Sequence, residues 1–143
     1  EQVVVCGGGI VGLECAVMLG MEGKRVTVID QIPLEKFADG MPVFNHIELN
    51  HQLEQYGVTL VGGQRITAFG ENGVETVDAS GEKQTFAGDT YVLALGVKPD
   101  NRLAQQLLST YAEGVYVVGD CVSTGRLLAD ANQEAFHAAI RIR

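Results

Sequence analysis

Residues 2–30 read QVVVCGGGIVGLECAVMLGMEGKRVTVID, and this stretch decides the fold. Residues 2–6 (QVVVC) form a continuous run rich in valine, which is typical of a strand buried on both faces. Apolar residues then recur at helical spacing from Ile10 onward, and Gly23 supplies a C-terminal stop. Residues 25–29 (RVTVI) form a second β-branched run. Strand, helix and strand within roughly 30 residues predict a right-handed βαβ unit with parallel strands.

The pattern after this unit predicts the rest of an α/β fold. After a loop at 31–42 with two prolines, we expect a helix at about 43–56 and buried strands at 58–61, 91–95 and 115–118, with a last helix at about 127–142. Three shorter strands are expected at about 65–69, 74–78 and 84–87, joined by the turn signals Asn72-Gly73 and Ser80-Gly81. The sequence therefore predicts a Rossmann-like parallel sheet with an inserted three-stranded antiparallel meander.

The strand order expected for the parallel sheet is 3-2-1-4-5. In this arrangement residues 115–118 dock beside residues 91–95, and residues 98–114 serve as the crossover that parallel pairing needs. The final helix then covers one face of the sheet. The alternative is that residues 112–143 pack on a neighbouring chain, because the same apolar surface favours a swap.

Composition limits the function classes. The chain has 143 residues, of which 46% are hydrophobic and 20% charged, which suits one compact domain. A formal net charge of -8 leaves no basic surface for a phosphate backbone, so we expect no nucleic-acid partner. No apolar run approaches the roughly 20 residues that cross a bilayer, and the N-terminus lacks a basic leader. We therefore predict a cytoplasmic protein without a membrane partner.

Neither the cysteines nor the histidines indicate a metal site or a catalytic group. Three cysteines form no CxxC pair and no metal-ligand spacing, and we interpret them as reduced, buried or half-buried thiols: Cys6, Cys15 and Cys121. Three histidines are interpreted as solvated or internally satisfied: His46, His51 and His137. A reactive Cys121 near a helix start is a minority interpretation, since it has no resolving partner.

The central chemical signal is the loop Gly7-Gly8-Gly9-Ile10-Val11-Gly12, which fits GxGxxG as Gly7, Gly9 and Gly12. It follows a predicted strand and opens a predicted helix, which is the context that makes the motif specific. The first glycine allows a tight turn, the second lets a pyrophosphate approach the backbone, and the third lets the helix pack on the strand. We expect the backbone N–H groups of Gly9, Ile10 and Val11 to face the pyrophosphate at the positive end of the helix.

Asp30 ends the second strand, 18 positions after Gly12, and predicts a preference for NADH. Its carboxylate can accept hydrogen bonds from the ribose hydroxyls of NAD, whereas a 2′-phosphate would meet its negative charge. Gln31 follows, so no arginine stands there to compensate that charge. The alternative is that the glycines serve only a tight turn and that Asp30 merely ends a strand.

The whole pattern resembles the pyridine-nucleotide domain of the flavoprotein reductases with two dinucleotide-binding domains. The segments that carry the resemblance are the meander, VVVCGGGIVGLECA (3–16), YVLALGVKPDNRL (91–103) and VYVVGDC (115–121). Residues 115–142 are most similar to the C-terminal module of NADH:flavin oxidoreductases related to 2-enoate and 2,4-dienoyl-CoA reductases, in which an old-yellow-enzyme barrel precedes the module. The resemblance implies NADH and FAD as cofactors.

The resemblance also implies further binding residues. The segment that begins at Gly96 passes near the nicotinamide, and Glu14 lies beside nicotinamide and flavin. Gly119 and Asp120 match the second flavin motif, in which the aspartate hydrogen-bonds the FAD ribitol. Glu14 is equally well interpreted as an exposed helix glutamate, and Asp120 as an N-terminal cap of the last helix.

By the same resemblance, residues 1–111 form an NAD(H)-binding domain, and residues 112–143 match the end of an FAD-binding domain. The chain has one GxGxxG motif, no redox-active cysteine pair, no barrel and no iron-sulfur cluster motif. It starts without Met and stops inside a helical pattern, so we expect a fragment whose partner is the rest of a parent flavoprotein. The isolated chain should not turn over alone.

Two other function classes compete with an oxidoreductase domain. A non-catalytic module that senses a dinucleotide uses the same unit, and a methyltransferase could hold the ribose of S-adenosylmethionine through Asp30. The flavin-type segment Gly119-Asp120 counts against a sensor. The third glycine and the meander count against a methyltransferase.

Overall fold

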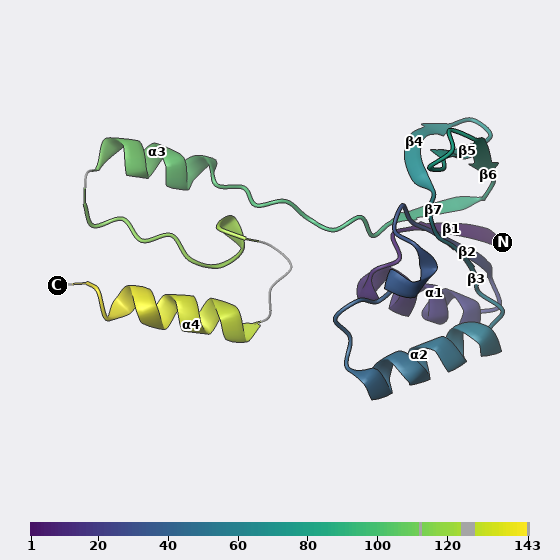
Figure 1. Cartoon of the computed structure of the whole chain (residues 1–143), viewed down its shortest axis with the longest axis horizontal. Helices are drawn as coiled ribbons and strands as arrows, with labels where there is room; N and C mark the ends of the chain where they lie inside the picture. Colours follow the sequence, from purple (N-terminus) through teal and green to yellow (C-terminus); the bar gives the residue numbers. More distant parts are fainter. Residues whose placement is uncertain (112, 124–127, 143) are drawn as a thin grey trace. The chain divides into compact units, whose positions relative to one another are not determined.

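The computed structural model describes residues 1–111, 113–123 and 128–142 (Figure 1). The chain divides into two compact units, residues 1–95 and residues 96–143, which we call the first and the second unit. The predicted division into an NAD(H)-binding domain at 1–111 and a flavin-type segment at 112–143 is a statement about function and stays a prediction.

A parallel sheet forms the centre of the first unit. Its strands are β1 (Gln2–Cys6), β2 (Arg25–Ile29), β3 (Thr59–Val61) and β7 (Thr90–Leu93), in the order β3-β2-β1-β7. All neighbouring strands run parallel, with Val5 opposite Val28 on one side and Val92 on the other. The predicted α/β class and the predicted order of the first four strands are confirmed.

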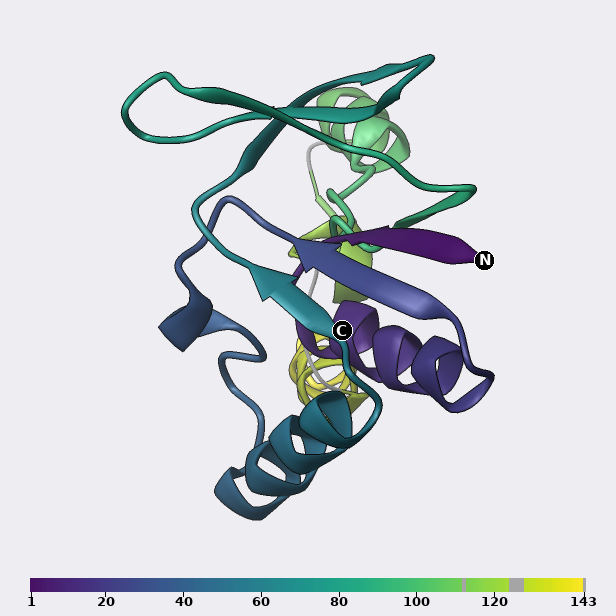
Figure 2. The same cartoon turned by 90° about the vertical axis from the view of Figure 1, so that its right-hand side faces the viewer.

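The two faces of this sheet have different coverings, which Figure 2 shows on opposite sides of the strands. Helices α1 (Ile10–Met21) and α2 (Val43–Gln55) lie on one face. There Val3 and Val5 pack with residues of both helices, among them Leu13 and Leu53. Side chains alternate along a strand, so the neighbours Val4 and Cys6 point to the other face. This explains why β1 is apolar at every position after Gln2.

The meander covers the second face of the sheet. It consists of β4 (Arg65–Gly70), β5 (Gly73–Val77) and β6 (Lys83–Phe86), which pair antiparallel in this order. Val74 is fully buried and packs with Val4, Cys6 and Ile29 of the parallel sheet. Gly73 has φ 136°, a value that favours glycine, and it begins β5 opposite Gly70, so the turn lies at Glu71-Asn72, one residue before the predicted Asn72-Gly73. The predicted inserted meander is confirmed.

The second unit contains helices α3 (Arg102–Thr110) and α4 (Leu128–Ala139) and the short 3₁₀ helix η2 (Gly119–Cys121). Another short 3₁₀ helix, η1 (Leu34–Lys36), lies in the first unit. The predicted fifth strand is wrong, because residues 115–118 form no strand. A β-branched run favours an extended backbone, but a strand also needs a paired neighbour, and propensity alone does not supply one. No described helix is long and apolar enough to span a membrane.

Candidate functional site

The glycine loop lies at the carboxyl ends of the parallel strands, where ligands bind in open α/β sheets (Figure 1). Gly7 donates its N–H to the carbonyl of Ile29 at 2.8 Å, and Ala94 donates to the carbonyl of Cys6 at 2.8 Å. The end of β1 is therefore tied to the ends of both neighbouring strands. α1 begins at Ile10 directly after the loop, as predicted.

Gly7 and Gly12 are glycine because the backbone is crowded around them. Gly7 has φ 126°, and a Cβ there would collide with the backbone carbonyl of Ala94. A Cβ on Gly12 would collide with the carbonyl of Gly7. Both residues are buried. Their roles are the tight turn and the close contact between helix and strand that the sequence predicts.

Gly9 differs from these two glycines because nothing in the chain crowds it. Its backbone is extended, with φ -73° and ψ 172°, and a Cβ built there would meet no atom within 4 Å. Gly9 is also exposed, and it precedes α1 without a side-chain cap. The fold therefore does not require glycine here. A ligand phosphate that approaches the helix N-terminus does require it, so this geometry fits a dinucleotide.

Asp30 stands at the end of β2, half-buried beside the glycine loop. Its Oδ2 accepts the N–H of Gly8 at 2.7 Å, and its Oδ1 accepts the N–H of Ile32 at 3.2 Å. Its backbone N–H donates to Val61 on β3 at 3.1 Å. Each carboxylate oxygen can accept a further hydrogen bond. Asp30 can therefore hold the loop and still accept hydrogen bonds from ribose hydroxyls. The neighbouring Gln31 is exposed.

The remaining predicted residues of the first unit lie on α1. Val11 is 74% exposed and Glu14 is exposed, whereas Ile10 is half-buried. The backbone N–H groups of Ile10 and Val11 belong to the first turn of the helix, whose N–H groups have no partner within the helix. Both interpretations of Glu14, as a cofactor contact and as an exposed helix residue, remain predictions.

The other predicted residues belong to the second unit. Gly96 is exposed, with φ 77°. Gly119 has φ 79° and donates its N–H to Oε2 of Glu134 on α4 at 2.7 Å. Asp120 is exposed and lies within η2. The alternative interpretation of Asp120 as an N-terminal cap of the last helix is wrong, because residues 121–123 after it are not part of α4.

Two residues near the glycine loop were not predicted from the sequence. Phe37 and Ala38 follow η1, and they are only 4% and 2% exposed. Phe37 packs its ring on Gly8, and Ala38 donates its N–H to the carbonyl of Gly8 at 2.9 Å. The signal that could have found them is an apolar pair inside a loop, where exposed polar residues are the rule.

The thiol of Cys6 lies in the core of the first unit. Cys6 is fully buried beneath the meander, and burial raises the pKa of its thiol to about 11. Cys121 is half-buried, and its Sγ lies 3.1 Å from the carbonyl oxygen of Val118. On α2, His46 is half-buried and His51 is exposed. Within residues 1–111, 113–123 and 128–142, no three acidic, histidine or cysteine side chains form a possible metal site.

Comparison with protein families gives one match that spans most of the chain. The family model described as pyridine nucleotide-disulphide oxidoreductase matches residues 1–139. A bilirubin reductase from Mediterraneibacter gnavus is 36% identical over 141 residues, with 96% of this chain and 21% of the relative covered. An NADH oxidase from Thermoanaerobacter brockii is 30% identical over 142 residues, with 99% of this chain and 21% of the relative covered. The chain thus spans about a fifth of these relatives.

Two solved structures that are similar to the chain are also reductases. A 2-naphthoyl-CoA reductase, in complex with 2-naphthoyl-CoA, matches with a TM-score of 0.77 and 26% identity, over 100% of this chain and 21% of that protein. An NAD-dependent persulfide reductase from A. fulgidus matches with a TM-score of 0.56 and 31% identity, over 74% of this chain and 19% of that protein.

Proposed function

Because the chain belongs to the pyridine nucleotide-disulphide oxidoreductase family, we propose that it is the NADH-binding part of a flavoprotein oxidoreductase. The observation that carries this proposal is the contrast among the loop glycines. Gly7 and Gly12 are explained by crowding within the chain, whereas Gly9 is explained only by a ligand at the helix N-terminus. The relatives named NADH oxidase and bilirubin reductase support an oxidoreductase.

In this proposal the pyrophosphate of NADH lies at the N-terminus of α1. The N–H groups of Gly9, Ile10 and Val11 bind it, and no lysine or arginine is required. Asp30 binds the ribose hydroxyls next to the adenine, and Gln31 leaves its charge uncompensated. A 2′-phosphate would therefore be repelled, so NADH is the favoured cofactor. Bound NADH supplies a hydride, and this chain holds and orients the NADH.

The hydride acceptor in this proposal is FAD, held largely by other parts of a longer flavoprotein. The chain covers 21% of the NADH oxidase and of the bilirubin reductase, and it contains one glycine loop. Gly96, Glu14, Gly119 and Asp120 would contact the nicotinamide or the flavin. The domain division at residues 111 and 112 belongs to the same proposal.

We further assign the chain to the branch of 2-enoate and 2,4-dienoyl-CoA reductases. The match to 2-naphthoyl-CoA reductase over the whole chain supports this assignment, since the name of that protein also describes a reductase of a CoA ester. A flavin barrel would then belong to the parent protein.

A titration with NADH tests the proposed function. The full chain should increase the fluorescence of NADH on binding, and NADPH should bind more weakly. The Gly9→Val variant tests the site directly, because a Cβ at Gly9 would meet no protein atom within 4 Å but would enter the space proposed for the phosphate. Absence of NADH binding to the wild-type chain would overturn the proposal. Rapid reduction of added FAD by NADH with this chain alone would contradict the expected need for a parent protein.

A further inference from the structure

The connection between β2 and α2 is packed against the glycine loop rather than free. Lys36 and Phe37 donate their N–H groups to Pro33 and Leu34, at 2.9 and 3.0 Å, which forms η1. Phe37 and Ala38 then enter the core, at 4% and 2% exposure. Ala38 has φ 54°, the one positive φ among the described residues other than glycine. This left-handed conformation is unfavourable for alanine, so the surrounding contacts must maintain it.

The contact with Ala38 fixes the peptide that joins Gly8 and Gly9. The carbonyl of Gly8 accepts the N–H of Ala38 at 2.9 Å. A trans peptide is planar, with its carbonyl and its N–H pointing in opposite directions. Since the carbonyl of Gly8 points toward Ala38, the N–H of Gly9 points away from it. Gly9 is the exposed residue whose surroundings fit a phosphate.

A peptide between two glycines needs such a contact. Neither Gly8 nor Gly9 has a side chain that opposes rotation of the peptide plane, so the plane can turn at low cost unless neighbours hold it. Asp30 holds the N–H of Gly8 at 2.7 Å, and Ala38 holds its carbonyl. The two contacts together leave Gly8 one orientation.

Phe37 explains why Gly8 is glycine although the GxGxxG pattern does not require it. A Cβ on Gly8 would lie 2.7 Å from Cζ and 2.8 Å from Cδ2 of the Phe37 ring. The ring therefore covers the Cα of Gly8 directly. Phe37 and Gly8 are complementary: a large ring at one position requires no side chain at the other.

We propose that Phe37 and Ala38 are positioning residues of the dinucleotide site, which fix the Gly8–Gly9 peptide so that the N–H of Gly9 faces the pyrophosphate. This inference rests on the proposed function and extends it to residues that do not touch the ligand. Phe37 contacts the Cα of Gly8, and Ala38 donates its N–H to the carbonyl of Gly8. The pyrophosphate then meets an N–H that is already aimed at it, which avoids the cost of ordering the loop on binding.

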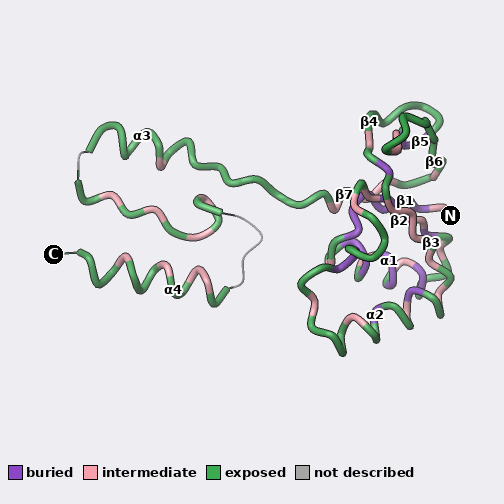
Figure 3. Tube along the Cα trace, viewed as in Figure 1, coloured by how far each residue is buried: buried purple, intermediate pink, exposed green. Residues whose placement is uncertain are grey.

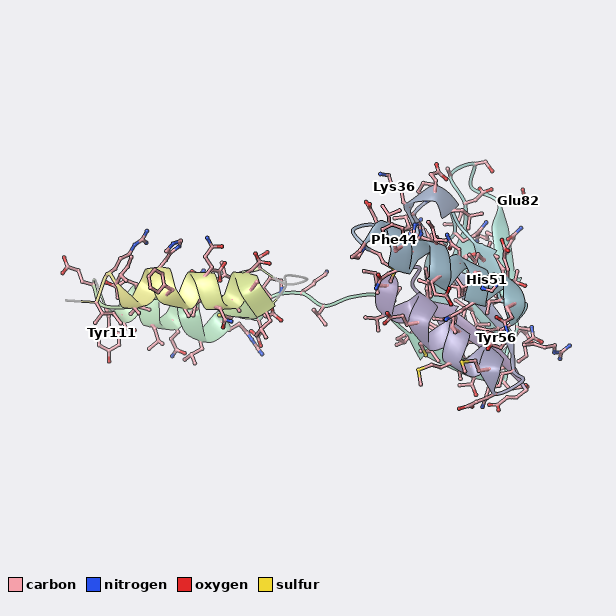
Figure 4. All side chains as sticks on the ribbon, turned by 90° about the horizontal axis from the view of Figure 1, so that it is seen from below. Lys36, Phe44, His51, Tyr56, Glu82 and Tyr111 are labelled. Atoms are coloured by element: carbon pink, nitrogen blue, oxygen red, sulfur yellow. The ribbon has the colours of Figure 1, made fainter. Side chains whose placement is uncertain are left out.

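The test compares Phe37→Ala with Phe44→Ala in the full chain. Phe44 lies on α2 in the same unit and is 85% exposed, so it undergoes the same chemical change outside the core (Figure 4). We expect Phe37→Ala to raise the Kd for NADH roughly tenfold, the effect of one misaligned hydrogen bond to a charged group. Phe44→Ala should leave it unchanged. Kd is measured well below the melting temperature of each variant.

Double substitution separates positioning from general destabilisation. Gly8→Ala should weaken NADH binding at least tenfold, because the new Cβ meets the Phe37 ring. In Gly8→Ala/Phe37→Ala the ring is absent, so the Kd should return toward the value of Phe37→Ala. If the loss of affinity came only from destabilisation of the fold, the double variant would have the highest Kd. That result would overturn the proposal. If Phe37→Ala does not fold, Phe37→Leu replaces it, with a smaller expected loss.

A spectroscopic measurement completes the test. In an amide NMR spectrum of the ¹⁵N-labelled chain, Gly9 should shift on addition of NADH in the wild type and in Phe44→Ala, and less in Phe37→Ala. If the wild-type chain binds no NADH, the proposed function fails and this inference with it. If the wild type binds NADH and Phe37→Ala binds it equally well with the same Gly9 shift, only the positioning role is overturned.

Discussion

The two units of the chain differ in how they bury apolar side chains (Figure 3). All buried residues among those described belong to the first unit, between Val3 and Thr76. In the second unit no described residue is buried, and Leu103, Leu108 and Phe136 are 67%, 47% and 63% exposed. Burial of apolar surface is the dominant favourable term in folding. The glycine loop therefore belongs to a unit that buries a core of its own, whereas Gly119 and Asp120 belong to a unit in which no described residue is buried.

Local contacts stabilise the second unit instead. Arg102 forms a bidentate ion pair with Asp100, at 2.9 and 2.6 Å, beside the start of α3. Tyr116 donates its hydroxyl to the carbonyl of Arg141 at 2.9 Å. Exposed ion pairs and single hydrogen bonds contribute little, typically about 1 kcal/mol or less. We therefore expect the second unit to unfold at lower denaturant concentration than the first.

The largest expected effect comes from removing one leucine from each unit. Leu53 on α2 is 2% exposed, and Leu108 on α3 is 47% exposed. Leu53→Ala should lower the free energy of unfolding by about 2–5 kcal/mol, and Leu108→Ala by less than about 0.5 kcal/mol. Urea denaturation followed by far-UV circular dichroism measures both. Equal losses would contradict the comparison, since Leu108 would then be as well packed as Leu53.

Gly9→Val should separate the stability of the first unit from its binding function. The Cβ of the new side chain meets no protein atom within 4 Å, so the melting temperature should change little, while NADH affinity should fall roughly a hundredfold or more. Gly7→Val provides the contrast within the same loop. With φ 126° and a crowded backbone, it should destabilise the fold itself. A Gly9→Val variant that binds NADH normally would disprove the phosphate loop.

Asp30→Ala should weaken NADH binding by about 1–3 kcal/mol, because a half-buried acceptor of hydroxyls is removed. NADPH binding should change little or improve, since the repulsion of its 2′-phosphate disappears. Asp130→Ala makes the same change at a half-buried position of α4 in the second unit and should affect neither cofactor. Calorimetric titrations with both cofactors give the comparison. Equal losses for NADH and NADPH would show that Asp30 serves only the loop, through its contact with Gly8.

The fold could be predicted from the sequence where several signals agree. Residues 2–30 combine a β-branched run, a helical period and a glycine loop between them, and each signal indicates the same βαβ unit. β1, α1 and β2 lie as predicted, and the loop and Asp30 lie together because both follow the carboxyl ends of adjacent strands. This part of the site could therefore be predicted from the local pattern of the sequence.

Elements and contacts that depend on distant parts of the chain could not be predicted. Residues 115–118 carry the same kind of run as β1 but form no strand, because the run does not supply a neighbour. Phe37 contacts Gly8 from 29 positions away, which no periodicity reveals. Residues 98–114 were expected only as a crossover, and α3 within them was not predicted. The signal for its start is Asp100, which accepts the N–H of Arg102 at 3.4 Å just before the helix.

The last expected effect concerns pH and the core of the first unit, and at neutral pH it is absent. Burial raises the pKa of the Cys6 thiol from its ordinary value of 9.0 to about 11. Between these two values the folded chain keeps a proton that the unfolded chain has released. Stability linked to Cys6 is thus fully present below pH 9.0 and is lost as the pH rises toward about 11.

Cys6→Ala should therefore lose less stability than the wild type between pH 9.0 and about 11, although it is less stable at neutral pH. Other groups also titrate in this range, so the decisive quantity is the difference between variants. Cys121→Ala, the same change at a half-buried position of the second unit, is the matched control. Urea denaturation at a series of pH values gives the two slopes. The slope of unfolding free energy against pH should be shallower for Cys6→Ala than for Cys121→Ala, because Cys6 is buried and Cys121 is only half-buried. Equal slopes would mean that Cys6 is open to solvent.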